Sequence, residues 1–248
     1  MIQVTDYSTK PPKNIDKSDV KEEMKELLEE LEDLQYLLQA EEKYSLLIIL
    51  QGMDASGKDG ITKKVFGACS PSGINVHSFK KPTEEEFAHD FLWRIHKLVP
   101  RKGKIAIFNR SHYEDVLIQR VHGWISDELA EKRIAAINAF EDLLTFDNNT
   151  IILKFFLHIS KEQQAIELQQ RIDERKKQWK HNEGDWRERE HWDKYMWAYE
   201  QVLNKSAIPW HIIPMDERWY GQYLITKKVI ETLNDLEMEF PKLAPIKK

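Results

Sequence analysis

The sequence contains a single cysteine, Cys69, among 248 residues, so no disulfide can form within the chain. It has no apolar run that approaches the roughly 20 residues needed to span a membrane. The first 13 residues are polar and lack the apolar stretch of a signal peptide. These absences exclude disulfide-stapled and membrane-spanning classes, and we expect a cytoplasmic protein with no membrane partner.

Internal repeats and low-complexity linkers are also absent, which argues against solenoid and linker-joined architectures. Apolar residues make up 41% of the chain and aromatic residues 10%, enough to fill the core of one sizeable domain. We expect an N-terminal tail and amphipathic helix over residues 1–43 and one main domain over residues 44–248. The helix is indicated by leucines at helical spacing between residues 20 and 38, with acids on the opposite face.

The segment from Ser45 to Gly60, SLLIILQGMDASGKDG, places a short apolar run before a glycine-flanked turn that ends in Lys58. The spacing of Gly52, Gly57 and Lys58 matches the GxxxxGK phosphate-binding loop (P-loop). Glycines allow the backbone amides to point at anionic oxygens, and the lysine adds a positive charge. Asp59 stands where the loop usually has the hydroxyl residue that binds Mg²⁺, so we expect the metal to be held differently.

Apolar runs after the loop alternate with helical patterns, which predicts a doubly wound parallel α/β sheet whose ligands lie beyond the carboxyl ends of the strands. The expected strands cover residues 46–50, 74–79, 105–108, 150–159 and 212–214. The expected helices cover residues 19–42, 58–68, 83–99, 126–146, 161–179, 189–203 and 217–236. Thr83 and Glu86 form a capping-box pattern at the start of one of these helices.

Charge is unevenly distributed around a net value of −5. Residues 19–42 hold ten acids and two lysines, whereas residues 94–113 hold six basic residues and no acid. A second basic cluster lies at residues 171–180. Charge runs are commonly solvated surfaces, but the placement of the two basic clusters near the phosphate loop favours an anion-binding role for them.

Asp54 lies inside the loop, where a carboxylate would repel phosphate unless a cation lay between them. We therefore predict that Asp54 is a ligand of Mg²⁺, with Mn²⁺ as an alternative, or holds a metal-bound water. The other interpretation is a helix N-cap. The predicted third strand ends in Asn109 and Arg110, and Arg110 is placed to stabilise a transferred phosphoryl group.

Two further positions in the same segment are ambiguous from the sequence. His112 fits a buried structural role or a catalytic one, the former being commoner. Glu114 fits either a metal-linked group or a favourable charge at a helix N-terminus.

Residues 171–193 combine basic side chains with three tryptophans around Gly184. Arg171 and Arg175 are four residues apart and share a helix face. Two short helices that close over an anion, as in the lid of a nucleotide kinase, would have this composition, and such a lid excludes water from phosphoryl transfer. In the other interpretation the aromatic residues are core and the basic residues are surface.

Together these motifs resemble the polyphosphate kinase 2 family, and in particular its single-domain members that phosphorylate nucleoside mono- and diphosphates. The resemblance rests on GMDASGKDG at residues 52–60, FNRSHYEDVL at 108–117 followed by Arg120-Val121-His122, PTEEEFAHDFLWRIH at 82–96 and GDWREREHWDKY at 184–195. It implies a P-loop NTPase fold like that of thymidylate kinase, with a helical lid at about residues 171–193 of the main domain. It also implies Mg²⁺-dependent phosphoryl transfer between inorganic polyphosphate and AMP or ADP, with GMP and GDP as further candidates, in the direction of NDP and NTP synthesis.

Carried over by motif, the resemblance implies catalytic roles for Asp54, Lys58 and Arg110. The residues expected to bind substrate are Gly52, Met53, Ala55, Ser56, Gly57, Asp59, Gly60, Asn109, His112, Glu114, Arg120, Arg171, Arg175, Lys176 and Lys180. The family often has Asp at the position of Asn109, and its members are commonly oligomeric, so a homodimer or homotetramer is expected.

Two other functions fit parts of the sequence. An ATP-dependent kinase of a nucleoside monophosphate or small metabolite would share the P-loop. A P-loop protein without catalytic activity could instead bind nucleotides or grip a nucleic-acid backbone with its basic segments. The isoelectric point near 6.0 and the absence of a recognisable nucleic-acid motif argue against a nucleic-acid partner.

Overall fold

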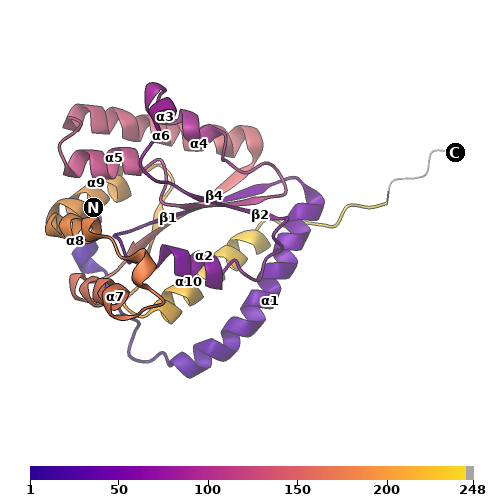
Figure 1. Cartoon of the computed structure of the whole chain (residues 1–248). Coiled ribbons are helices and arrows are strands. Elements are labelled where there is room, and N and C mark those ends of the chain that lie inside the picture. Colours follow the sequence, from indigo (N-terminus) through magenta and orange to yellow (C-terminus); the bar gives the residue numbers. More distant parts are fainter. Residues whose placement is uncertain (244–248) are drawn as a thin grey trace.

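A computed structural model describes residues 1–243, and its centre is a five-stranded sheet (Figure 1). The strand order is β2 (Ile74–Ser78), β3 (Ile105–Asn109), β1 (Ser45–Gln51), β4 (Thr150–His158) and β5 (Trp210–Pro214), with every pairing parallel. All seven residues of β1 are buried, as expected for an apolar strand in the middle of a parallel sheet. In the register, Ile48 of β1 lies between Ile107 of β3 and Leu153 of β4.

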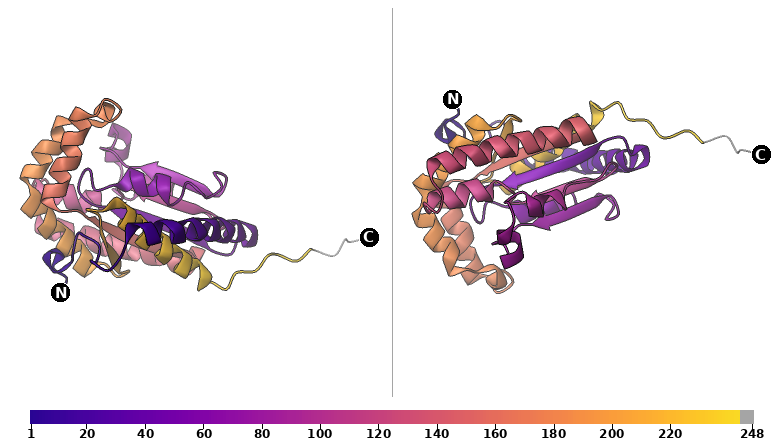
Figure 2. Two further views of the ribbon diagram at one scale, coloured as in Figure 1. Left: turned by 90° about the horizontal axis from the view of Figure 1, so that it is seen from below. Right: turned by 90° about the horizontal axis from the view of Figure 1, so that it is seen from above.

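Helices cover both faces of this sheet, which confirms the predicted doubly wound α/β class (Figures 1 and 2). One face carries α1 (Lys17–Glu41), α2 (Lys58–Lys64) and α10 (Arg218–Asn234), and the other carries α3 (Glu84–Ala88), α4 (Trp93–His96), α5 (Glu114–Val121) and α6 (Asp127–Asn148). The remaining helices, α7 (Lys161–Asp173), α8 (Glu183–Glu190) and α9 (Trp192–Lys205), gather beyond the carboxyl ends of the strands. Two short 3-10 helices are η1 (Val4–Asp6) and η2 (Gln178–Lys180).

The long helix α1 packs against α10, and the tail before it lies against the carboxyl ends of β4 and β5. Val4 is buried there, and Thr9 donates a hydrogen bond to Asp216 at 2.8 Å. The segment 1–43 therefore packs on the rest of the protein. Residues 244–248 of the predicted main domain lie outside the described residues. No helix within residues 1–243 has the length and apolar character that a bilayer crossing requires.

Most predicted elements are present, but three predicted helices are shorter than expected. The capping box at Thr83 forms as predicted, yet the helix begun there ends at Ala88 because His89 is extended and Asp90 hydrogen-bonds the amide of Leu92. A separate turn of helix, α4, follows. The helix from residue 161 ends at Asp173 because Glu174 takes an extended conformation, and the helix from Lys58 ends at Lys64.

Candidate phosphate-binding site

The phosphate loop connects the carboxyl end of β1 to the start of α2. Gly57 has a φ of 104°, which favours glycine, and a side chain at Gly52 would lie 2.7 Å from the carbonyl oxygen of Leu157. The helix begins at Lys58 with Gly57 as its N-cap, so Asp54 is not the cap residue. The Lys58 ammonium donates hydrogen bonds to the carbonyl oxygens of Gly52, at 2.8 Å, and Met53, at 3.1 Å, within the loop.

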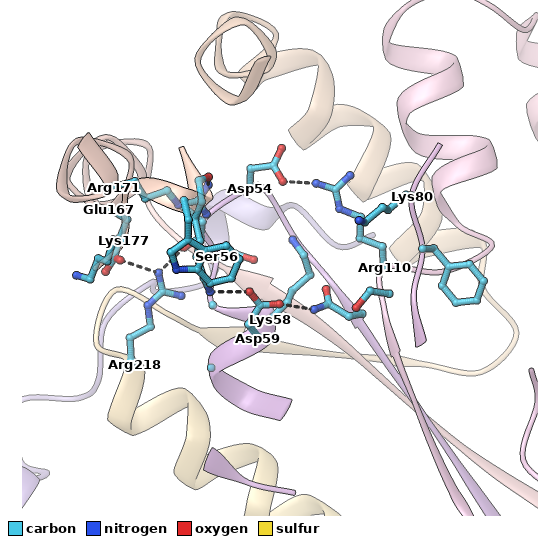
Figure 3. A pocket seen from close by; sticks show the side chains of 18 of the residues that line it. Asp54, Ser56, Lys58, Asp59, Lys80, Arg110, Glu167, Arg171, Lys177 and Arg218 are labelled. Atoms are coloured by element: carbon cyan, nitrogen blue, oxygen red, sulfur yellow. Dashed lines mark hydrogen bonds and ion pairs between the residues drawn. The ribbon is translucent and has the colours of Figure 1, made fainter. Parts of the chain in front are cut away.

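A cavity of about 770 Å³ opens beside this loop and is bounded by β2, β3, α7, η2 and α10 (Figure 3). Among the described residues, eight lysines and arginines line it but only three acids, in a chain whose net charge is −5. The basic residues are Lys58, Lys80, Lys81, Arg110, Arg171, Lys177, Lys180 and Arg218. This concentration of positive charge suits a highly charged anion.

Asp54 and Arg110 form an ion pair across the cavity (Figure 3). Burial alone would raise the pKa of Asp54, but the charges of Arg110 and Lys58 outweigh it and hold the pKa below its ordinary value. Glu114 lies 3.9 Å from Arg110, and burial raises its pKa despite the neighbouring Arg110 and Lys58. Asp54 is therefore held in its ionised form by the two neighbouring positive charges.

Lys58 is buried, with 8% of its surface exposed. Burial, followed by repulsion from Arg110, lowers the pKa of Lys58 to about 8. An anion bound at the loop would raise the pKa of Lys58 again and stabilise its charged form.

Asp59 connects the loop to the rest of the site through two hydrogen bonds. Its carboxylate accepts from Asn109 at 2.7 Å and from Lys180 of η2 at 2.9 Å. Burial by itself would raise the pKa of Asp59. The hydrogen bond and positive charge of Lys180, together with the hydrogen bond from Asn109, outweigh burial and hold the pKa below its ordinary value.

The predicted lid is formed by the end of α7, by η2 and by α8. Arg171 on α7 pairs with Asp185 on α8 at 2.6 Å, which ties the two helices together. Trp179 on η2 lines the cavity and is 78% exposed, so the interpretation of the tryptophans as core does not hold for it, whereas Trp192 is buried.

Eleven of the predicted site residues line the cavity: Asp54, Ala55, Ser56, Gly57, Lys58, Asp59, Gly60, Asn109, Arg110, Arg171 and Lys180. Gly52 and Met53 lie behind the loop, where their carbonyl oxygens hold Lys58. Glu114 lies behind Arg110.

The remaining predictions are at odds with the observed positions. His112 is fully buried and hydrogen-bonds Glu141 at 3.4 Å, which supports the structural interpretation and argues against contact with substrate. Arg120 lies in a separate depression and pairs with Asp127 at 2.7 Å. Arg175 and Lys176 do not line the cavity, because the chain leaves the helical path at Glu174 and the Lys176 side chain is 82% exposed.

Sequence reasoning missed several cavity residues, among them Lys80, Lys81, Lys177, Arg218 and Gln222. Lys80 and Lys81 follow β2 by two and three residues, and Arg218 follows β5 by four residues. The signal available was position, because basic residues after the carboxyl ends of parallel strands converge on one edge of the sheet. Arg218 also pairs with Glu167 at 3.4 Å and donates a hydrogen bond to the carbonyl oxygen of Ala55.

The described residues contain no cluster of three or more His, Cys, Asp or Glu side chains suited to a metal ion. Mg²⁺ needs fewer protein ligands, since one or two carboxylates with phosphate oxygens and water complete its coordination. Asp54, ionised and facing the cavity, fits this requirement.

Comparisons of this chain with a family model, with curated proteins and with solved structures all point to one family. The family model described as Polyphosphate kinase 2 (PPK2) matches residues 14–241. The chain is 48% identical over 214 residues to an AMP/ADP-polyphosphate phosphotransferase of Meiothermus ruber, covering 85% of this chain and 80% of that protein. It is 40% identical to an ADP-polyphosphate phosphotransferase of Rhodopseudomonas palustris, covering 92% and 85%. The crystal structure of polyphosphate kinase 2 from Arthrobacter aurescens TC1 superposes with a TM-score of 0.92 at 42% identity, covering 96% of this chain and 86% of that one.

Proposed function

This chain belongs to the polyphosphate kinase 2 family, and we propose that it transfers phosphoryl groups between inorganic polyphosphate and the nucleotides AMP and ADP. The names of the relatives from Meiothermus ruber and Rhodopseudomonas palustris support this choice of substrates. The observation that carries the proposal is the cavity beside the phosphate loop, where eight basic side chains from five different parts of the chain converge. A nucleotide and a polyphosphate chain together present more negative charge than a single nucleotide does, and this cavity matches that charge.

In the proposed reaction, the loop amides and Lys58 hold the terminal phosphates of the acceptor. Arg110 stabilises the charge that spreads over the oxygens of the transferred group, and its pairing with Asp54 orients it. The basic residues of α7, η2 and α10 hold the polyphosphate donor. Asp54 would hold Mg²⁺, or Mn²⁺ in its place, which would neutralise charge on the phosphate oxygens.

Other parts of the proposal concern the setting of the reaction. We propose that the net direction is NDP and NTP synthesis, that GMP and GDP are further acceptors, and that the enzyme is a homodimer or homotetramer in the cytoplasm. The buried, unpaired Cys69 is compatible with a reducing compartment.

The test is a donor comparison with the purified protein and Mg²⁺. AMP or ADP is incubated with polyphosphate or with ATP, and the products are separated by chromatography. We expect ADP and ATP to form from AMP when polyphosphate is the donor. Product that forms with ATP as the donor but not with polyphosphate would support the ATP-dependent kinase. If neither donor transfers a phosphoryl group to AMP, ADP, GMP or GDP, the result would support a binding protein without catalytic activity.

A further inference from the structure

A fully buried ion pair lies behind the site, in a part of the protein that the proposed reaction does not use. The Lys154 ammonium, from the middle of β4, lies 2.6 Å from the Glu141 carboxylate on α6, and neither residue has exposed surface. Buried ion pairs can often be replaced by apolar residues without loss of stability, because desolvation offsets their attraction. Stability alone therefore does not account for this pair.

The pair is connected to the segment that carries Arg110. The Tyr113 hydroxyl accepts a hydrogen bond from Lys154 at 2.8 Å and donates one to Glu141 at 2.9 Å. His112, also without exposed surface, contacts the same carboxylate at 3.4 Å. Two consecutive residues that follow Arg110 by two and three positions are thus held from within the core.

The same segment is held from the side of β1. The Arg110 amide donates to the carbonyl oxygen of Leu50 at 3.0 Å, and the Ser111 hydroxyl accepts from the Gln51 side chain at 3.2 Å. Arg110 itself has a φ of 62°, in the left-handed region that non-glycine residues rarely adopt. Such a conformation persists where the surrounding contacts determine it, and it commonly occurs at functional sites.

We propose that Lys154 and Glu141 are positioning residues, which act through Tyr113 and His112 to hold the Arg110 backbone in its left-handed conformation. That conformation directs the guanidinium toward Asp54 and the cavity. The inference rests on the proposed function, in which Arg110 stabilises the charge on the transferred phosphoryl group. It adds a determinant of catalysis that lies outside the cavity.

The experiment replaces the pair as a unit, with the double variant Lys154→Met/Glu141→Leu in the full-length protein. We expect a folded variant whose midpoint of thermal unfolding is lowered, because Tyr113 and His112 lose a buried partner, together with little change in KM and a fall in kcat of about 10- to 100-fold. In an Arg110→Ala background the same double change should produce no further fall, because the pair acts through Arg110. Equal falls in both backgrounds, or an unchanged kcat in a folded variant, would overturn the proposal.

Tyr113→Phe is the second variant, since it keeps the ring and removes only the hydroxyl. We expect its kcat to fall as well. Thr150→Val is the matched control. It removes a buried 2.9 Å hydrogen bond to Ser45 at the amino end of β4, the strand that carries Lys154, and it lies at the opposite end of the sheet from Arg110. Its kcat should remain that of the wild type, and a fall equal to that of Tyr113→Phe would overturn the proposal.

A crystal structure of Tyr113→Phe separates this inference from the proposed function. We expect Arg110 to leave the left-handed region and its pairing with Asp54 to be lost. An unchanged Arg110 conformation would overturn the positioning role whichever phosphate donor the enzyme uses. A wild-type enzyme that uses ATP and not polyphosphate would overturn the proposed donor, and the variants would then be compared with ATP.

Discussion

The side-chain amide of Asn109 donates a 2.7 Å hydrogen bond to the carboxylate of Asp59. These are the two positions at which the chain departs from the usual P-loop pattern, which has a hydroxyl residue after the lysine and an acid at the end of the neighbouring strand. The two departures are therefore complementary. An acid at position 109 would face the Asp59 carboxylate, whereas the amide can donate to it.

Asn109→Asp should place two carboxylates within hydrogen-bonding distance and raise the pKa of one of them. Because the Asp59 side chain is 67% exposed, solvent screens the repulsion, and we expect a loss of about 1 kcal/mol or less in the free energy of unfolding. Urea denaturation at neutral pH measures this loss. Adding Asp59→Ser should reverse it, and additive effects of the two changes would contradict the pairing.

Lys58→Ala should abolish most activity while the fold is retained. Removing one preorganised charge from a phosphoryl-transfer site lowers kcat by roughly 10²- to 10³-fold. Steady-state kinetics measures the loss of activity, and circular dichroism checks that the fold is retained. Lys64→Ala is the matched control because Lys64 lies at the other end of the same helix, exposed and outside the cavity, and its rate should equal that of the wild type.

Binding of the nucleotide should weaken as the pH rises above about 8, the pKa to which burial lowers Lys58. The bound phosphates favour the charged lysine, so binding takes up a proton in this range, and the dissociation constant should rise by up to about tenfold per pH unit. Calorimetric titration without metal, in buffers of different ionisation enthalpy, counts that proton. Lys58→Met should bind weakly at every pH and show no such dependence.

The same shift has a consequence for the ligand-free protein. The unfolded chain holds the Lys58 proton up to the ordinary pKa of 10.5, whereas the folded protein releases it near 8. The contribution of Lys58 to the free energy of unfolding should therefore rise between these two pH values and be absent in Lys58→Met. Urea denaturation across this range measures the difference between the two proteins.

Lid lysines should differ in importance according to their position. Lys177→Ala and Lys180→Ala remove charges that line the cavity, and each should raise KM for polyphosphate by about tenfold, as expected for one charge-assisted contact. Lys176→Ala removes a neighbouring charge whose side chain is 82% exposed and outside the cavity, so its KM should remain unchanged. Equal effects of all three changes would indicate a diffuse electrostatic attraction without a defined donor site.

Asp54→Asn tests the proposed metal role. The amide keeps the shape of the side chain but removes the charge, so we expect a higher Mg²⁺ concentration at half-maximal rate and a kcat lowered by about 100-fold. Rates measured over a range of Mg²⁺ and Mn²⁺ concentrations check this. An Asp54→Asn enzyme with the Mg²⁺ dependence of the wild type would contradict the assignment.

The strands and the phosphate loop were predictable from the sequence because their signals are local. The apolar run at residues 46–50 is short and is followed closely by Gly52, which favours a buried strand, and the spacing from Gly52 to Lys58 predicts the turn. Arg171, predicted on one face of a basic helix, lines the cavity. Arg175, predicted on the same face, does not, because the chain becomes extended at Glu174 and the helical face ends there.

Lys80 and Arg218 carry no local motif, and they reach the cavity only because β2 and β5 end at the same edge of the sheet as β1. His112 shows the opposite case, since a histidine within a functional segment points into the core toward Glu141. The sequence by itself determined the α/β class and the phosphate loop that carries Asp54 and Lys58, because short-range spacing and hydrophobic periodicity encode them. Tertiary structure decided which remote charges surround the anion site and which polar groups are buried, because strand order and helix packing bring together residues that are far apart in the chain.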